Sequence, residues 1–421
     1  MEYTKREVLQ YIEENNVKFI KLFFVDIFGD VKSISIQPSL LNRAFEEGIS
    51  FDASAVKGFL NEETSDLFIV PDPSTLSVLP WRPQHGRVAR LYCNIRYLDG
   101  TPFAGDSRLI LQNVIDRCKK LGYETKVGTE CEFYLFKLDE NGLPTMVPHD
   151  NAGYCDLAPL DKGENVRRDI ILTLEQMGIQ PETSHHENGP GQNEIDFHYN
   201  DTMNAADNLS TFKMAVRTIA AQDGLFASFL PKPLAKQSGS GLHVNISLHK
   251  DGENIFKANN PEAHYFIAGI LAHIREMTAF LNPMNQSYKR LGEFEAPKYV
   301  SWSSQNRSPL IRVPAAKGDA VRIEVRSPDS SCNQYLALAL LIAAGLDGIE
   351  NKMELMQPVN KNLFAVSENE LKHLERLPSS LDEALHLAEN SSFVQSVIPE
   401  LTLSTFVQTK SRCEDPAFGV V

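Results

Sequence analysis

Residues 127–136 read VGTECEFYLF and place Glu130 and Glu132 inside a segment that is otherwise mostly apolar and aromatic. Aromatic residues and apolar alternation favour a β-strand. Residues i and i+2 of a strand point to the same side, so the two carboxylates face one way, roughly 6.5 Å apart along the chain. Two like charges in an apolar setting are costly unless something compensates them. The segment therefore predicts a strand whose polar face needs a compensating partner.

The size and charge of the chain exclude several classes of protein. At 421 residues it is too long for one small core, which predicts two domains or three. Its hydrophobic content of 42% and charged content of 23% are typical of a soluble globular protein. A net charge of −14 argues against nucleic-acid or anionic-membrane binding, because both need a basic face. Anionic substrates need only a local basic pocket, so they stay possible.

Three features predict a cytoplasmic protein with no membrane partner. The six cysteines are scattered without a CxxC pair, so neither a disulfide framework nor a zinc knuckle is indicated. The first residues, MEYTKREVLQYIEENN, are charged and amphipathic, unlike a signal peptide. The longest apolar run, 335–346, is shorter than the roughly 20 residues that span a bilayer.

Hydrophobic spacing and turn signals outline the elements of the chain. The turn-rich stretch DGTPFAGDSR suggests a domain boundary near residue 102, which divides the chain into 1–102 and 103–421. The last 70 residues are expected to be mostly helical, except for the unpatterned tail SRCEDPAFGVV. Helices are predicted over 4–16, 107–121 with Gly122 just after the end, 164–177, 208–221, 261–281 and 334–346. Strands are predicted as a pair around the turn FGD in 17–36, then within 76–100, 127–136, 183–199, 238–250 and 319–329.

Polar residues occupy one face of several of these strands. His243, Asn245 and Ser247 share one face of GLHVNIS, and Arg322, Glu324 and Arg326 share one face of VRIEVR. Each strand alone has a structural explanation, such as a solvated face or a cross-strand ion-pair stripe. Taken together, five carboxylates and one imidazole need cations in order to ionise in a low-dielectric site. Oxygen and nitrogen ligands without thiolate favour Mg²⁺ or Mn²⁺, so a two-metal site is predicted. Its ligands are Glu130, Glu132, Glu187, Glu194, His243 and Glu324.

Five arginines accompany these groups: Arg290, Arg307, Arg312, Arg322 and Arg326. The rigid fork of arginine recognises phosphate and carboxylate. Two metals with several arginines are typical of phosphoryl transfer, where positioning and charge neutralisation dominate catalysis. The chain contains no GxxxxGK[ST] motif, which excludes a P-loop enzyme.

An ordered set of motifs resembles the type I glutamine synthetases. In chain order these are VDIFGDVK, FDASAVKGF, GTECEF, GYCDLAP, HHENGPGQNEID, PKPLAKQSGSGLHVNISL, NQSYKRL, EAPKYVSWSSQNRSPLIRVP and RIEVRSPD. The resemblance implies an α+β fold, with a small N-terminal β-grasp domain and a C-terminal catalytic domain built on a curved antiparallel sheet flanked by helices. It also implies a homo-oligomer, hexamer or dodecamer, whose active sites lie between neighbouring subunits of a ring.

The resemblance further implies a role for each matching residue. The ligands of one metal would be Glu132, Glu187 and Glu194, and those of the other Glu130, His243 and Glu324. ATP would contact Glu182, Asn245, Ser247, Arg307, Arg312 and Arg322. Glutamate would contact Ser238, Gly239, Arg290, Arg307 and Arg326. Ammonium would be held by Tyr154, Glu187, Glu295 and, from a neighbouring subunit, Asp52. The catalytic residues would be Asp52, Glu295, Arg307 and Arg326.

The implied reaction has two steps. ATP phosphorylates the side-chain carboxylate of glutamate, and ammonia then attacks the acyl phosphate to give glutamine, ADP and phosphate. An alternative keeps this chemistry with a larger amine, such as ethanolamine, a monoamine or a polyamine. A non-catalytic ring-forming regulator is less favoured because all six ligands are present. A two-metal hydrolase is less favoured because it would not need five arginines.

The departures from the family pattern gather around the amine and amino-acid pockets. Ala55 stands where a serine is usual, Ser238 where an asparagine is usual, and Asn193 where a histidine is usual. The flap KRLGEFEAP is one residue shorter than usual, which leaves open whether Glu293 or Glu295 takes the amine-binding position. The C-terminal segment is also shorter, which leaves open a hexamer or a loosely stacked dodecamer.

Overall fold

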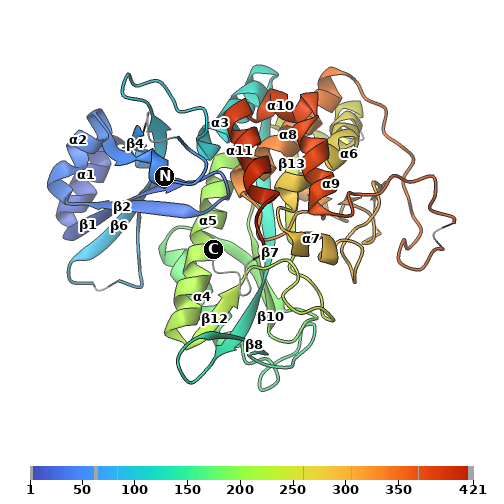
Figure 1. Cartoon of the computed structure of the whole chain (residues 1–421), viewed down its shortest axis with the longest axis horizontal. Helices are drawn as coiled ribbons and strands as arrows, with labels where there is room; N and C mark the ends of the chain where they lie inside the picture. Colours follow the sequence, from blue (N-terminus) through green and yellow to red (C-terminus); the bar gives the residue numbers. More distant parts are fainter. Residues whose placement is uncertain are drawn as a thin grey trace.

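The computed structural model describes residues 3–60, 65–82, 84–258, 260–304, 306–367 and 369–415. The last part of the tail SRCEDPAFGVV, from residue 416, lies outside the described residues. Figure 1 shows the N-terminal segment, in blue, on one side of a larger part that contains the rest of the chain. The fold is mixed α/β, with a curled N-terminal sheet of the β-grasp type and a large C-terminal sheet flanked by helices.

The N-terminal sheet has the strand order β2-β1-β6-β4-β3, with β5 paired to β6. Strands β1 and β2 form the predicted hairpin, in which Val25 pairs with Val31 around the FGD turn. β1 and β6 run parallel, whereas the other neighbours run antiparallel. The elements are α1 (Lys5–Glu14), β1 (Val17–Val25), β2 (Val31–Ile36), α2 (Leu41–Glu46), β3 (Ile49–Asp52), β4 (Asp66–Pro71), β5 (Ser77–Val78) and β6 (Arg87–Arg96).

Strand β7 (Tyr123–Leu138) contains the segment VGTECEFYLF and is the central strand of the large sheet. It follows directly from α3 (Ser107–Lys120), because Gly122 adopts φ +84° and ends the helix as predicted. The sheet order is β15-β16-β17-β13-β7-β10-β9, and β8, β11 and β12 also pair with β7. The other strands are β8 (Pro144–Pro148), β9 (Pro181–His186), β10 (Gln192–Phe197), β11 (Asn200–Asp201), β12 (Leu225–Ser228), β13 (Leu242–Lys250), β14 (Glu253–Asn254), β15 (Trp302–Ser303), β16 (Ile311–Arg312) and β17 (Ile323–Val325).

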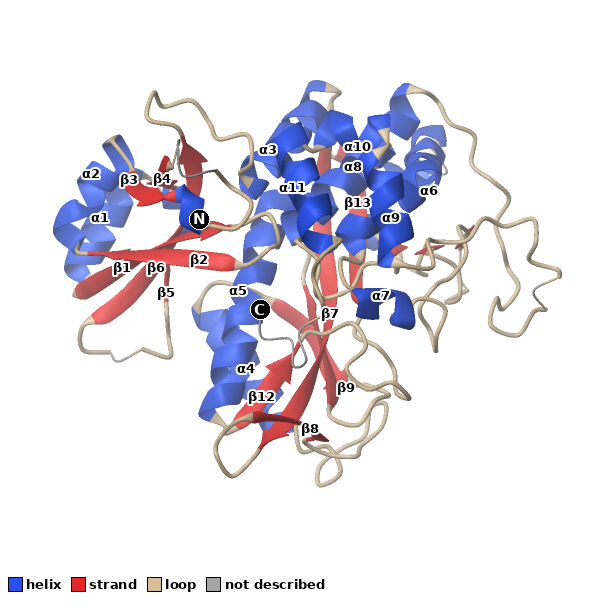
Figure 2. Ribbon diagram, viewed as in Figure 1, coloured by secondary structure: helices blue, strands red, loops and turns tan. Residues whose placement is uncertain are grey.

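The apolar face of β7 packs against the core. Phe133 lies on this face and makes edge contacts with Phe212 of helix α5 (Thr202–Gln222), 6.0 Å between ring centroids. Cys131, on the same face, is fully buried. Glu130 and Glu132 therefore point to the opposite side, as strand alternation requires. Figure 2 shows β7 running from among the helices at one end to β8 and β12 at the other.

Most of the helices pack around one end of the large sheet (Figure 2). The long helices α6 and α8 cross closely at Gly269 and Gly348, where an added Cβ at Gly269 would lie 2.1 Å from the Ala344 carbonyl oxygen. Among the described residues, no helix combines the length and apolarity that crossing a membrane would require. The helices are α4 (Glu164–Gln176), α5 (Thr202–Gln222), α6 (Pro261–Leu281), α7 (Asn285–Arg290), α8 (Gln334–Glu350), α9 (Leu381–Glu389), α10 (Ser392–Val397) and α11 (Glu400–Lys410).

Three expectations about the elements were wrong in part. Helix α5 begins six residues before 208, because its first turn buries Thr202 and Ala205 against the sheet although the sequence there is polar. Only three residues of 319–329 form a strand, namely β17. In the described part of the last 70 residues, helix is confined to α9, α10 and α11, and the described part of 353–380 is turns and loops. That stretch contains Pro358 and Pro378 and lacks helical apolar spacing.

Candidate active site

A cleft of about 840 Å³ opens on the polar face of the large sheet. Strands β7, β9, β10, β13 and β17, the loop after β8 and the loop after α7 contribute its walls. Most of the residues predicted from the sequence line this one cleft. They are Glu130, Glu132, Tyr154, Glu187, Glu194, Ser238, Gly239, His243, Arg290, Glu295, Arg307, Arg312, Arg322, Glu324 and Arg326.

Strand register brings the carboxylates side by side. Glu194 of β10 lies directly opposite Glu132 of β7. On the other side of β7, His243 of β13 lies opposite Glu130. One strand further, Glu324 of β17 pairs with Asn245 of β13. Since opposite residues in antiparallel strands have Cβ atoms about 5 Å apart, the polar faces merge into one acidic floor.

The first cluster on this floor is Glu130, His243 and Glu324. His243 Nδ1 lies 3.0 Å from Glu130 Oε2 and 3.5 Å from Glu324 Oε1. The three residues offer ligand atoms that all lie within 4.8 Å of one another. Two carboxylates and an imidazole in this arrangement suit a divalent cation with oxygen and nitrogen ligands.

The second cluster contains His185, Glu187 and Glu194, whose ligand atoms also lie within 4.8 Å of one another. His185 Nε2 is 2.9 Å from Glu187 Oε1. Glu132 borders this cluster and accepts hydrogen bonds of 2.9 Å from Gln192 Nε2 and the Gly241 amide. The structure therefore adds His185 to the set expected from the sequence.

Sequence reasoning missed two residues of the cleft, His185 and Asp196. His185 shares a strand face with Glu187 at i, i+2, so its spacing was a usable signal. Asp196 has the same relation to Glu194 and lies opposite Glu130 in the sheet. Its carboxylate accepts a hydrogen bond from the Thr183 hydroxyl.

Burial and mutual repulsion set the charges on the acidic floor. Burial alone would raise the pKa of Glu130, but hydrogen bonds from His243 and Asn245 lower it to about 2. Burial raises the pKa of Glu132, and the nearby Glu187 carboxylate adds to this effect. Burial and the Glu132 carboxylate hold the pKa of Glu194 well above its ordinary value. Divalent cations would allow all of these carboxylates to ionise together, so the donor set fits two metal ions.

Buried arginines form the cationic side of the cleft. Arg326 is 2% exposed, and its Nη1 has no hydrogen-bond partner among the described residues. Its guanidinium lies beside Glu324, at 3.2 Å. Arg290 is also buried and donates to the Ser327 carbonyl oxygen at 2.8 Å. A buried guanidinium with a free donor at a cleft wall is suited to an anionic ligand.

The backbone comes close to Arg290 at Gly239. An added Cβ there would lie 2.4 Å from the Pro231 carbonyl oxygen and 2.8 Å from Arg290 Cγ. Only glycine therefore fits between the 231–241 loop and Arg290.

The shortened flap after Arg290 folds as a compact turn. The Glu293 amide donates to the Arg290 carbonyl at 3.0 Å, and the Ala296 amide donates to the Glu293 carbonyl at 3.1 Å. Glu293 and Glu295 both line the cleft, but the Glu295 carboxylate is the one that lies 4.0 Å from Arg326. The geometry thus favours Glu295 over Glu293 for a role beside Arg326.

Four of the expected residues lie outside this cleft. Asp52 ends β3 in the N-terminal sheet, where its carboxylate is exposed and accepts from the Ser54 amide at 3.0 Å. Glu182 is exposed on β9. Asn245 is on the same face of β13 as His243 and donates to Glu130 Oε1 at 2.9 Å. Ser247, further along β13, lies 3.2 Å from His249 Nε2.

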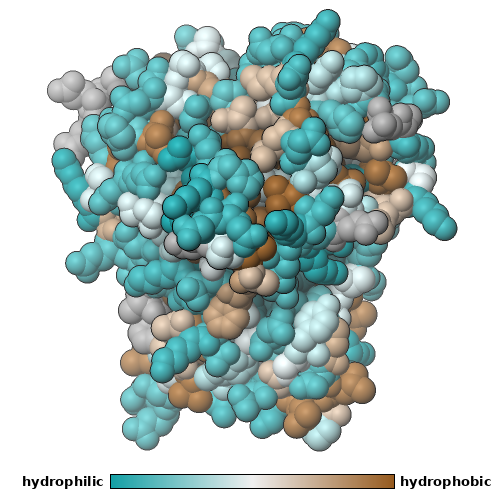
Figure 3. Space-filling view, turned by 90° about the vertical axis from the view of Figure 1, so that its right-hand side faces the viewer, coloured by the Kyte–Doolittle hydropathy of each residue, from teal (hydrophilic) through white to brown (hydrophobic). Residues whose placement is uncertain are grey.

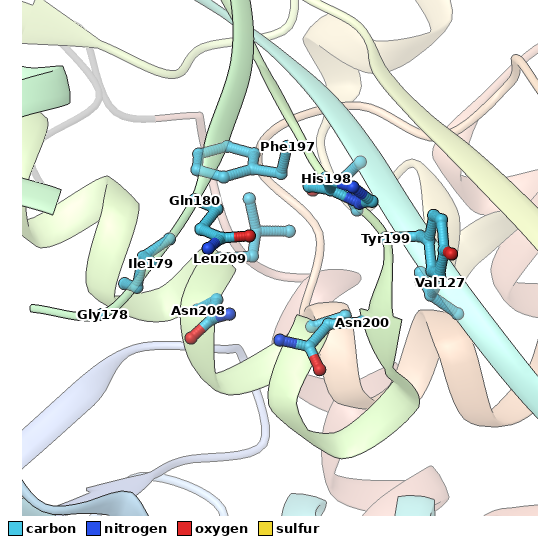
Figure 4. Close-up of a pocket in the computed structure, with 12 residues that line it drawn as sticks. Val127, Gly178, Ile179, Gln180, Phe197, His198, Tyr199, Asn200, Asn208 and Leu209 are labelled. Carbon is cyan, nitrogen blue, oxygen red and sulfur yellow. The ribbon is translucent and has the colours of Figure 1, made fainter. Parts of the chain in front are cut away.

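A smaller hollow of about 60 Å³ lies behind the sheet, between β7 and the first turns of α5. Figure 4 shows Gln180, Asn200 and Asn208 around it, each from a different segment. No carboxylate or arginine lines this hollow, and it has room for little more than water. The cleft on the polar face is therefore the candidate active site.

Family models and curated relatives match nearly the whole chain. The family model described as the glutamine synthetase β-grasp domain matches residues 16–97, and that of the glutamine synthetase catalytic domain matches 104–418. A glutamine synthetase of Methanosarcina mazei is 48% identical over 99% of this chain and 96% of its own length. One of Clostridium saccharobutylicum is 47% identical over 97% of this chain and 94% of its own length.

Solved structures share the fold. A complex of GmaS with ADP superposes with a TM-score of 0.88 at 28% identity and covers 96% of this chain and 94% of its own. A Plasmodium falciparum glutamine synthetase superposes with a TM-score of 0.86 at 26% identity, over 97% of this chain and 95% of its own.

Proposed function

The chain belongs to the glutamine synthetase family and is an ATP-dependent glutamate–ammonia ligase, and from this premise we propose how the residues of its cleft divide the work. The observation that carries the proposal is the juxtaposition of an acidic floor with Arg326, whose buried Nη1 faces no protein acceptor among the described residues. With divalent cations held on the acidic floor, such a site would neutralise phosphate groups, while the guanidinium would recognise a carboxylate or phosphoryl oxygen.

Two divalent cations, Mg²⁺ or Mn²⁺, are proposed for the acidic floor. One would be held by Glu130, His243 and Glu324, and the other by Glu132, Glu187 and Glu194. When bound, such ions neutralise the charge that develops on a transferring phosphoryl group. His185 holds the Glu187 carboxylate at 2.9 Å and so orients it toward Glu194.

The arginines orient the two anionic substrates. Arg290 and the glycine backbone at Gly239 would bind the amino-acid end of glutamate, beside Ser238. Arg307 and Arg326 would contact the γ-carboxylate and the phosphoryl group that it receives. Arg312 and Arg322 would bind the phosphates of ATP. Glu182 on β9, and Asn245 and Ser247 on β13, would be further contacts of ATP.

The amine pocket is proposed to lie between Tyr154, Glu187 and Glu295, with Asp52 of a neighbouring subunit. A ring of carboxylates binds ammonium and accepts the proton that leaves it, which frees the lone pair for attack on the acyl phosphate. The flap would cover this pocket and protect the acyl phosphate from water.

A ring-shaped homo-oligomer, hexamer or dodecamer, is part of this proposal. Asp52 is exposed on the N-terminal sheet and does not line the cleft of its own chain, so a second copy must supply it. Large apolar side chains are exposed around β8 and the loop that follows it: Leu143 is 60%, Leu157 78% and Leu160 61% exposed. Figure 3 shows hydrophobic groups at the lower end of the molecule, where Figure 1 places β8.

We also propose a domain boundary near residue 102 and a cytoplasmic location.

An amine panel tests the proposed substrate. The enzyme is incubated with ATP, Mg²⁺ and glutamate, and phosphate release is measured with ammonium, methylamine, ethanolamine and putrescine. We expect ammonium to give the highest kcat/KM. A larger amine that exceeds ammonium by about tenfold would overturn the assignment in favour of another γ-glutamyl ligase, because discrimination of that size reflects pocket contacts. Phosphate release without glutamate would indicate a hydrolase.

Removing the flap carboxylate should affect the amine step alone. We expect Glu295→Ala to lower kcat/KM for ammonium by roughly 10²-fold, the usual contribution of a positioned acid–base group, and to leave Mn²⁺ affinity unchanged. Glu293→Ala is the matched control, because it removes a carboxylate from the same turn. The carboxylate that lies beside Arg326 is that of Glu295. If the control shows the loss and Glu295→Ala does not, Glu293 is the amine-binding residue.

A further inference from the structure

A buried polar cluster lies beneath the amine side of the cleft and was not part of the predicted site. It consists of Asp150, Asp161, Arg167, His186 and Asn193, each no more than 8% exposed. The residues come from the loop after β8, the start of α4, the end of β9 and the start of β10. Buried charged groups are retained only when they are well satisfied, so their partners show what the cluster does.

Asp150 joins the loop 149–163 to the turn 187–191. Its Oδ1 accepts a 2.9 Å hydrogen bond from the Gly191 amide and lies 2.9 Å from His186 Nε2. Its Oδ2 accepts a 3.0 Å hydrogen bond from the Lys162 amide. One carboxylate thus closes the loop 149–163 on itself and fastens it to the turn 187–191.

These two segments carry Tyr154 and Glu187, the proposed ammonium contacts. His186, which contacts Asp150, also contacts Glu187, because its Nδ1 lies 2.7 Å from the Glu187 carbonyl oxygen. The Cys155 amide, next to Tyr154, donates to the His186 carbonyl at 2.9 Å. The Tyr154 ring in turn lies 5.3 Å from the His185 ring, edge to face. His186 therefore links Asp150 by hydrogen bonds to both the turn of Glu187 and the loop of Tyr154.

The contacts of the cluster argue against a third metal site, although Asp150, Asp161 and His186 offer ligand atoms within 4.8 Å of one another. Arg167 already forms a two-pronged ion pair with Asp161, one contact of which is 3.2 Å. Backbone amides already occupy both oxygens of Asp150. A metal ion would be placed beside a guanidinium, which electrostatics opposes.

Asn193, one of the positions where this chain departs from the family pattern, completes the cluster. Its Oδ1 accepts from Arg167, and its Nδ2 donates to the Gly191 carbonyl oxygen at 3.0 Å. The turn that carries Glu187 is thus held from two sides, by Asp150 on the Gly191 amide and by Asn193 on the Gly191 carbonyl.

We propose that Asp150 is a positioning residue for the amine pocket, which fixes the loop of Tyr154 and the turn of Glu187 relative to each other. The proposal rests on the proposed function, because it takes these two residues as ammonium contacts. Asp150 does not touch the amine. It acts by holding other groups in place, and small displacements of positioning groups can cost up to about 100-fold in rate.

The test is Asp150→Asn, which keeps the shape and removes one acceptor oxygen. We expect the KM for ammonium to rise about tenfold or more, while the KM values for ATP and glutamate change by less than about threefold. Asp106→Asn is the matched control, because Asp106 is also buried and accepts amide hydrogen bonds, from Ile95 of β6 and from Arg108 at the start of α3. It should lower thermal stability to a similar degree and leave the KM for ammonium unchanged.

Equal rises in all three KM values, or an unchanged KM for ammonium in a folded Asp150→Asn protein, would overturn the proposal. If Asp150→Asn does not fold, Asn193→Ala decides, with an expected rise of about threefold in the KM for ammonium alone. The wild-type amine panel separates the two proposals. If a larger amine is the substrate, the ammonium assignment fails, and a selective rise in the KM for that amine still supports the role of Asp150.

Discussion

Glu132→Gln is expected to lower the rate of glutamine formation roughly 10³-fold, the upper range for removing one preorganised charge-stabilising group, and to weaken divalent-metal binding. Glu132 is half-buried at the junction of the acidic floor and the glutamate side, opposite Glu194 in the sheet. Glutamine has the same shape but carries no charge. Its amide oxygen can still accept from Gln192 Nε2 and the Gly241 amide, which both point at Oε2 of Glu132, so the substitution removes the charge and the second acceptor oxygen.

Two measurements check this result: steady-state glutamine formation, and calorimetric titration with Mn²⁺ in the absence of substrates. Glu124→Gln is the matched control, because Glu124 lies on the same face of the same strand but is exposed at the far end. The control should keep kcat within about twofold, as surface substitutions usually do, and retain full Mn²⁺ affinity. A Glu132→Gln enzyme with normal turnover would disprove the metal assignment.

Arg326→Lys should reduce kcat by roughly 10²-fold with a smaller change in the KM for ATP, because lysine keeps the charge but loses the planar fork. Arg326 is buried between Glu324 and Glu295, and its Nη1 is directed to no acceptor among the described residues. We infer that this donor meets the transferring phosphoryl group. An interaction made mainly in the transition state lowers kcat and kcat/KM together when it is removed.

Single-turnover formation of ADP from ATP and glutamate measures this step before the amine enters. Arg275→Lys is the control, since Arg275 forms an ion pair with Glu383 at 3.4 Å in which both side chains are about one-third exposed. Exposed pairs of this kind contribute little, so the control should behave as wild type. If Arg326→Lys changed only the later, amine-dependent step, Arg326 would belong to the amine pocket and not to phosphoryl transfer.

Strand alternation was sufficient to choose most of the acidic floor from the sequence. The period of two places Glu130 with Glu132, and His243 with Asn245, on single faces whatever the surrounding fold. The same rule was not applied to His185 or Asp196, although each shares a face with a chosen glutamate. The choice between Glu293 and Glu295 in the flap could not be made in this way, because the side chains of a turn do not alternate regularly. The 4.0 Å approach of Glu295 to Arg326 depends on how the loop folds back onto β17.

The sequence by itself determined most of the elements, their polar faces and the family, because these depend on local periodicity and on ordered motifs. Tertiary structure decided which faces meet, for instance that Glu194 lies opposite Glu132, because register between strands depends on loops and packing far along the chain. It also decided the partners of buried polar residues. Nothing local in the chain indicates that Asp150 holds Gly191, His186 and Lys162 at once, since the contact with Gly191 joins residues 41 positions apart.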